Sequence, residues 1–156
     1  RSLKILSQTN HLLWKIDMQI TDKFDYIEFY PGPVKSCPKE DDEQIFCSDW
    51  VKYNYPEMVF FHCVNEGKKT IGQARKDQAK GLLKGVSDCL FLIPESLRGK
   101  YPFGAIELKR AGKTQASPVS NEQMAFLKSV RESGGFAGVA YGREGFLAAF
   151  KEMISK

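Results

Sequence analysis

The chain lacks several patterns that define common classes of protein. Its 156 residues contain no stretch of about 20 apolar residues, so we expect no membrane-spanning helix. The first residues, 1–4, do not begin the basic and then apolar pattern that marks a signal peptide. Neither a G-x-G-x-x-G motif nor a P-loop is present, which argues against a small-molecule enzyme that binds a nucleotide cofactor.

Cysteine and histidine are also scarce. Four cysteines stand at positions 37, 47, 63 and 89, and no two of them form a C-x-x-C pair. Metal ligation by cysteine is therefore not expected. His62 has no second histidine nearby, and we expect it to pack or to make a polar contact rather than to bind metal. Because nothing indicates secretion, we interpret the cysteines as reduced thiols of a cytoplasmic protein.

The charges are unevenly distributed along the chain. The net charge is only +4, but residues 68–84 hold six basic side chains against one acid. Residues 37–57 hold six acids against two lysines. A basic segment beside an acidic one suits a protein that holds a polyanion together with a divalent metal. On charge alone, a solvated lysine-rich loop is the simpler interpretation of residues 68–84.

The spacing of apolar residues predicts an α/β or α+β domain with helices flanking a mixed central sheet. We expect helices at about 40–53, 120–133 and 146–154, and strands at about 58–64, 88–93, 103–109 and 136–141. The basic segment 68–84 is predicted to be a loop with one or two helical turns. Residues 37–156 form the predicted domain, and residues 1–36 are an N-terminal extension of unclear role.

Chemistry-bearing residues gather on two strands that are neighbours in sequence. On strand 103–109, Glu107 and Lys109 point to the same face, because successive strand residues alternate. Such a pair, taken alone, is more often the solvated face of an antiparallel sheet. Asp88 opens the preceding apolar strand, which we expect to pair with it. Two carboxylates, a carbonyl and waters suit Mg²⁺, and a lysine can orient water or phosphate.

Several motifs then point to one family. The pattern Gly85-x-x-Asp88 followed by Glu107-Leu108-Lys109 resembles the D…ExK signature of the PD-(D/E)XK nucleases. Over roughly residues 38–155 the chain is similar to the virus-type replication-repair nuclease (VRR-NUC) family. The stretches that resemble its motifs are Glu40–Gln44 with Trp50, His62–Gly67, Gly85–Asp88, Ser120–Gln123 and Gly135 with the strand after it. Val64 and Ser87 stand where the family has prolines, and both adjoin expected loops, away from the acids and the lysine.

This resemblance implies an αβββαβ core and a metal site. Asp88 and Glu107, helped by the Leu108 carbonyl, would bind Mg²⁺ or Mn²⁺, and Lys109 would position the nucleophile. Glu40 would approach from the first helix.

For several other residues the sequence leaves more than one role possible. Glu43 is the alternative to Glu40, because both acids open the same predicted helix. Gln123 would lie near the site, although its place in an S-x-x-Q capping box also explains it. We expect the basic segment to follow the DNA backbone, through Lys68, Lys69, Arg75 and Lys84.

The activity implied is that of a structure-selective endonuclease acting on branched DNA in DNA repair. Standalone members of the family are phage or bacterial proteins and resemble homodimeric Holliday-junction resolvases, since two symmetric cuts need two sites. A flap or nicking nuclease that acts as a monomer is the alternative enzyme. A DNA-binding module without catalysis is the other alternative, and the complete acid–acid–lysine set argues against it.

Overall fold

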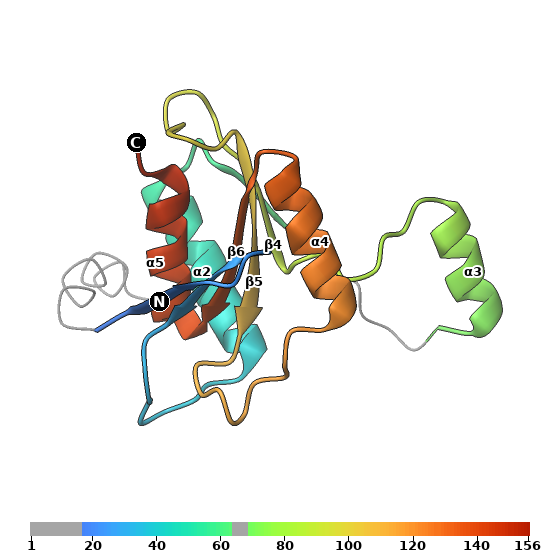
Figure 1. Ribbon diagram of the computed structural model, residues 1–156, viewed down its shortest axis with the longest axis horizontal. Coiled ribbons are helices and arrows are strands. Elements are labelled where there is room, and N and C mark those ends of the chain that lie inside the picture. Colours follow the sequence, from blue (N-terminus) through green and yellow to red (C-terminus); the bar gives the residue numbers. More distant parts are fainter. Residues whose placement is uncertain (1–16, 64–68) are drawn as a thin grey trace.

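A six-stranded mixed sheet forms the centre of the protein (Figure 1). The computed structural model describes residues 17–63 and 69–156. The strand order is β1-β2-β6-β5-β4-β3. The strands are β1 (Gln19–Asp22), β2 (Ile27–Tyr30), β3 (Val59–His62), β4 (Cys89–Leu92), β5 (Phe103–Lys109) and β6 (Phe136–Tyr141). The helices are α2 (Glu40–Asn54), α3 (Ile71–Ala79), α4 (Asn121–Glu132) and α5 (Gly142–Ile154).

The sheet combines two kinds of strand pairing. Strands β3, β4 and β5 pair antiparallel, whereas β5, β6 and β2 pair parallel. Helix α4 connects the parallel strands β5 and β6 and covers one face of the sheet, and α2 and α5 cover the other (Figure 1). The αβββαβ core expected from the sequence is thus present, as α2, β3, β4, β5, α4 and β6.

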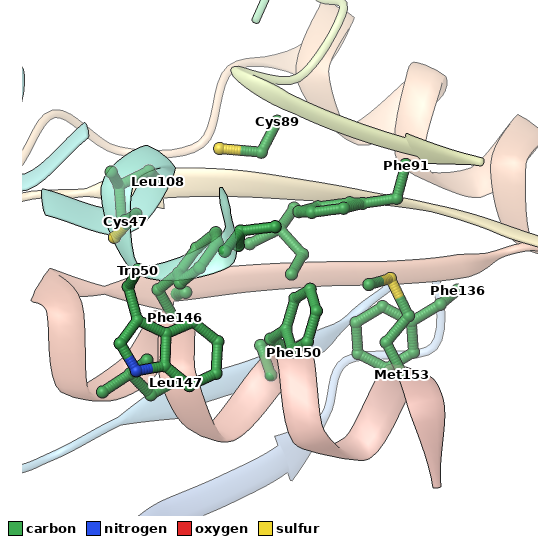
Figure 2. Close-up of a cluster of buried hydrophobic side chains, with 14 of the residues drawn as sticks. Cys47, Trp50, Cys89, Phe91, Leu108, Phe136, Phe146, Leu147, Phe150 and Met153 are labelled. Atoms are coloured by element: carbon green, nitrogen blue, oxygen red, sulfur yellow. The ribbon is translucent and has the colours of Figure 1, made fainter. Parts of the chain in front are cut away.

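The larger part of the core lies between the sheet and helices α2 and α5. Figure 2 shows Trp50 packed with Phe146 and Phe150 across from Phe91 of β4. On the other face, Leu127 of α4 and small residues of β5 and β6 form a second apolar cluster. Every residue of β5 from Gly104 to Lys109 is therefore buried. Neither face of β5 is open to solvent.

The structure confirms most of the expected elements and corrects others. The helix of the basic segment is longer than predicted: α3 has nine residues, capped by the Thr70 side chain. Helix α5 begins at Gly142, directly after β6, rather than at residue 146. Gly142 has a φ of +65°, which lets the chain turn at once from strand to helix. Strands β1 and β2 were not predicted, because the residues of β1 are all exposed and β2 depends on pairing with the distant β6.

Helix α3 lies apart from the rest of the molecule (Figure 1). None of its residues is buried. In the sequence it lies between β3 and β4. Within the described ranges, no helix has the length and apolar character needed to cross a membrane.

Candidate active site

Strand register brings the two predicted carboxylates together. The last pair of the β4–β5 ladder is Cys89 with Ile106, so Asp88 lies beside Glu107 at the end of the ladder. The Asp88 Oδ2 atom accepts a hydrogen bond of 3.0 Å from the Leu108 backbone N–H. Asp88 is therefore held on β5 by its side chain, next to the residue with which it is proposed to share a metal.

Lys109 and Gln123 complete the group around Glu107. The Lys109 ammonium lies 3.2 Å from Glu107 Oε1 and 3.2 Å from Gln123 Oε1. The Gln123 amide nitrogen also donates to Glu107 Oε1. Gln123 closes the Ser120 capping box as well, and Ser120 N–H donates to its Oε1 at 2.9 Å. The side chain that closes the capping box therefore also contacts Glu107 and Lys109.

Burial gives these acids unusual protonation behaviour. It raises the pKa of Glu107 to about 8, with a further increase from the Asp88 charge, while Lys109 acts in the opposite direction. Burial also raises the pKa of Asp88, against the hydrogen bond from Leu108 and the charge of Lys109. A buried and a half-buried carboxyl group, both with raised pKa values, form a place where a cation would be strongly stabilised.

The donor set fits a hard divalent cation. Glu107 Oε2 is buried and has no hydrogen-bond partner in the structure. The described residues place no group of three His, Cys, Asp or Glu side chains around one point. Two carboxylates with a backbone carbonyl and several waters are nevertheless the ligands that Mg²⁺ accepts, because it keeps much of its hydration. An orphaned carboxylate oxygen beside a second acid is consistent with such an ion.

A cleft of about 540 Å³ gives access to this group. Its walls include Glu40 of α2, His62 of β3, Lys84, Asp88 and the first turn of α4. Glu107 and Lys109 are 2% and 3% exposed and do not form its surface. They contact Gln123, which does line the cleft. A bound phosphate would thus meet Asp88 first, with Glu107 and Lys109 behind it.

His62 contacts the site in a way that the sequence did not indicate. Its Nδ1 lies 2.7 Å from the backbone oxygen of Asp88. A carbonyl oxygen only accepts, so Nδ1 carries the proton and donates it. The imidazole therefore supports the backbone of Asp88 from the neighbouring strand β3. The sequence feature that could have indicated this contact is the position of His62 near the end of a strand that was expected close to Asp88.

The first helix brings one of its two candidate acids to the cleft. Glu40 lines the cleft, and its charge contributes to the raised pKa of Glu107. Glu43 is 2% exposed and accepts a hydrogen bond of 2.8 Å from Arg143 Nε of α5. Glu43 thus ties α2 to α5. Gln44, one turn after Glu40, donates at 3.3 Å to the Cys89 sulfur and also lines the cleft.

The four residues expected to contact DNA occupy different places. Lys84 lines the cleft. Arg75 lies on α3, and Lys69 just before that helix forms an ion pair of 2.8 Å with Asp77. Lys68 lies outside the described residues. Among the three of these residues that the structure describes, only Lys84 lines the same cleft as Asp88.

A contact that no local pattern indicated holds the loop after β5. The Lys113 ammonium lies 2.7 Å from Glu28 Oε1, and over the rings of Tyr30 and Tyr141 at 4.4 and 5.0 Å. Tyr141 is the partner of Lys109 in the β5–β6 register. Strand β2, close to the N-terminus, thus fixes the loop that follows the site lysine. Glu28 and Lys113 are 85 positions apart, so only the fold brings them together.

Comparison with known proteins places this site in context. The family model of the VRR-NUC domain matches residues 38–144. A solved structure described as "VRR_NUC domain protein" aligns with a TM-score of 0.59 and 22% sequence identity, over 78% of this chain and 91% of that one. At this identity the likeness shows a shared fold. No curated protein sequence matches the chain.

Proposed function

Because the chain belongs to the VRR-NUC domain family, whose fold and chemistry are those of the PD-(D/E)XK nucleases, we propose that it is a metal-dependent DNA endonuclease. The observation that carries the proposal is the buried group of Asp88, Glu107 and Lys109. One Glu107 oxygen has no partner, and the adjoining cleft opens onto Asp88. The proposal is supported by the direct contact of Lys109 with Glu107 and by the position of Asp88 beside Glu107.

Each residue of the group has a distinct task in the proposed reaction. Asp88 and Glu107, with the Leu108 carbonyl, would hold Mg²⁺ or Mn²⁺. Such an ion acidifies a water and stabilises the charge on a phosphodiester undergoing hydrolysis. Lys109, fixed by Glu107 and Gln123, orients the attacking water or a phosphate oxygen through its charge. Glu40 adds negative charge at the cleft.

The proposed substrate is branched DNA, cut by a homodimer in the manner of a Holliday-junction resolvase. Two strands cut symmetrically require two sites related by a two-fold axis, and each chain has one such site. A monomeric flap or nicking nuclease is the alternative enzyme. We place the activity in DNA repair in the cytoplasm of a bacterial or phage-infected cell, consistent with four free cysteines.

Cleavage of labelled junction, flap and linear duplex DNA, with and without Mg²⁺ or Mn²⁺, tests the proposal. We expect metal-dependent cutting that is lost in Asp88→Asn, because the variant removes a ligand charge. Asp49→Asn, at an exposed acid of α2, is the matched control and should cut normally. Cutting by Asp88→Asn at the wild-type rate would contradict the assigned site. Paired symmetric cuts in a junction indicate the dimer, and single cuts at a flap indicate the monomer.

A further inference from the structure

The segment Lys69–Lys84, which we name the basic arm, is unusual in carrying exposed apolar residues among its charges. It contains five basic residues and one acid. Ile71 is 76% exposed, Leu82 38% and Leu83 57%. No residue of α3 is buried, and the arm extends away from the body of the molecule (Figure 1). Within the described part of the chain, these side chains thus have no apolar core to join.

The two leucines lie in an ordered turn at the end of α3. Gly81 has a φ of +98°, the left-handed conformation that ends many helices. The Leu82 N–H donates to the Asp77 carbonyl at 2.9 Å, and Gly81 N–H donates to Gln78 at 3.0 Å. These bonds form the double-bonded cap of a Schellman motif. The backbone that presents Leu82 to solvent is therefore fixed by hydrogen bonds.

This turn is joined directly to the mouth of the cleft. Lys84 and Gly85 line the cleft, one and two residues after Leu83. Gly85 has a φ of +76°, and a Cβ there would lie 2.3 Å from the Glu122 carbonyl carbon. So close an approach packs the end of the arm onto the first turn of α4, where Gln123 contacts Glu107. The leucines are thus held near the entrance to the catalytic group.

The charges around the leucines indicate what contacts them. A segment with five basic residues and one acid attracts a polyanion and repels most basic surfaces. Nucleic acid also offers an apolar surface, the faces of its bases, but only where bases are unstacked, as at a branch or single strand. Inserted leucine side chains are a known means of separating or capping base steps. A linear duplex offers phosphates to the lysines, but it exposes base faces to the leucines only after a base step has been unstacked at an energetic cost.

We propose that Leu82 and Leu83 contact unstacked bases at the branch point of DNA bound in the cleft. The lysines and Arg75 of the arm hold the backbone of the same DNA. The leucines thereby make the enzyme selective for branched over linear DNA. This inference rests on the proposed nuclease function and adds the element that recognises the branch.

The double variant Leu82→Ser/Leu83→Ser tests this proposal. DNA binding is measured in Ca²⁺, to prevent cutting, on junctions and flaps with 2-aminopurine at the branch and on linear duplex of equal length. Wild-type binding should raise the 2-aminopurine fluorescence, and the variant should not. The ratio of branched to linear affinity should fall by roughly tenfold. Linear affinity should be unchanged, since phosphate contacts remain. Ile20→Ser is the control, at a residue of β1 that is 57% exposed on the opposite edge of the sheet.

Three results would overturn the inference. An unchanged affinity ratio and an unchanged fluorescence rise would show that the leucines do not contact the branch. A change of oligomeric state in the variant, measured by light scattering, would assign them to a protein–protein contact instead. Absence of wild-type binding to every DNA would remove the proposed function itself, and this inference with it. Normal binding with an unaltered ratio would remove the inference alone.

Discussion

Replacement of Glu107 by glutamine should abolish cleavage and yet stabilise the metal-free protein. Glu107 Oε1 accepts hydrogen bonds from Gln123 and Lys109, and the amide oxygen of a glutamine preserves both. The amide nitrogen takes the place of Oε2, which is buried without a partner. The charge that burial and Asp88 disfavour is removed, while the shape of the side chain is retained.

The pKa of Glu107 sets the magnitude of this effect. Its folded value of about 8 lies above the ordinary value of 4.5, so the folded protein binds a proton that the unfolded chain has released. The free energy of unfolding therefore falls as the pH rises from 4.5 to about 8. Each pH unit in this range lowers the free energy of unfolding by at most about 1.36 kcal/mol. The total decrease is about 3 kcal/mol at pH 7 and below about 1 kcal/mol at pH 5. A glutamine side chain does not titrate, so the free energy of unfolding of the variant does not decrease in this way.

Urea unfolding in EDTA at pH values from 5 to 8 measures the difference directly. The variant should exceed the wild type by about 3 kcal/mol at pH 7, and the gap should narrow toward pH 5. Glu95→Gln, at an exposed glutamate, is the control and should show no such gap. Added Mg²⁺ should stabilise the wild type much more than Glu107→Gln, because binding to the folded state raises its stability.

Two results would refute this reasoning. A variant less stable than the wild type at pH 8 without metal would show that the Glu107 carboxylate is stabilised by its surroundings. A stability gap that does not change with pH would show that protonation of Glu107 is not its source.

Three further predictions follow from the site and the arm. Lys109→Ala should lower turnover by on the order of 10²-fold with little change in metal affinity, and loss of metal binding at unchanged turnover would contradict its role. Gly85→Ala should lower the thermal midpoint and the activity, because its Cβ meets the backbone of α4, and an unchanged midpoint would contradict that contact. Changing Arg75, Lys80 and Lys84 together to alanine should make the salt dependence of DNA affinity shallower by roughly two to three log–log units, and an unchanged slope would place the arm away from DNA.

Features set by local geometry could be predicted from the sequence. Glu107 and Lys109 share a face because strand residues alternate, and the Ser120–Gln123 pattern marks a helix start because its side chains satisfy free N–H groups. The acids of Glu40–Glu43 open α2, where the helix dipole favours them. Each of these patterns depends on residues no more than four apart.

Features that depend on contacts between residues far apart in the sequence could not be predicted from local patterns. Strands β1 and β2 are short. Strand β1 pairs with β2, and β2 pairs with β6, which lies more than a hundred positions along the chain. The contact of Lys113 with Glu28 joins a loop to one of these strands. The length of α3 was underestimated because its residues show no apolar face that packs on the body.

The most important feature that the tertiary structure determines is the burial of Glu107 and Lys109. By its sequence alone, this pair is more typical of the solvent-exposed face of a sheet, where it would be two solvated charges. In the folded protein, Leu127 of α4 packs over that face and Gln123 contacts both residues. Burial then raises the pKa of Glu107, and the end of the β4–β5 ladder brings Asp88 beside it. Alternation along the strand determined that the two side chains lie together. The packing of α4 removed them from water, and this strengthens the interaction between their charges.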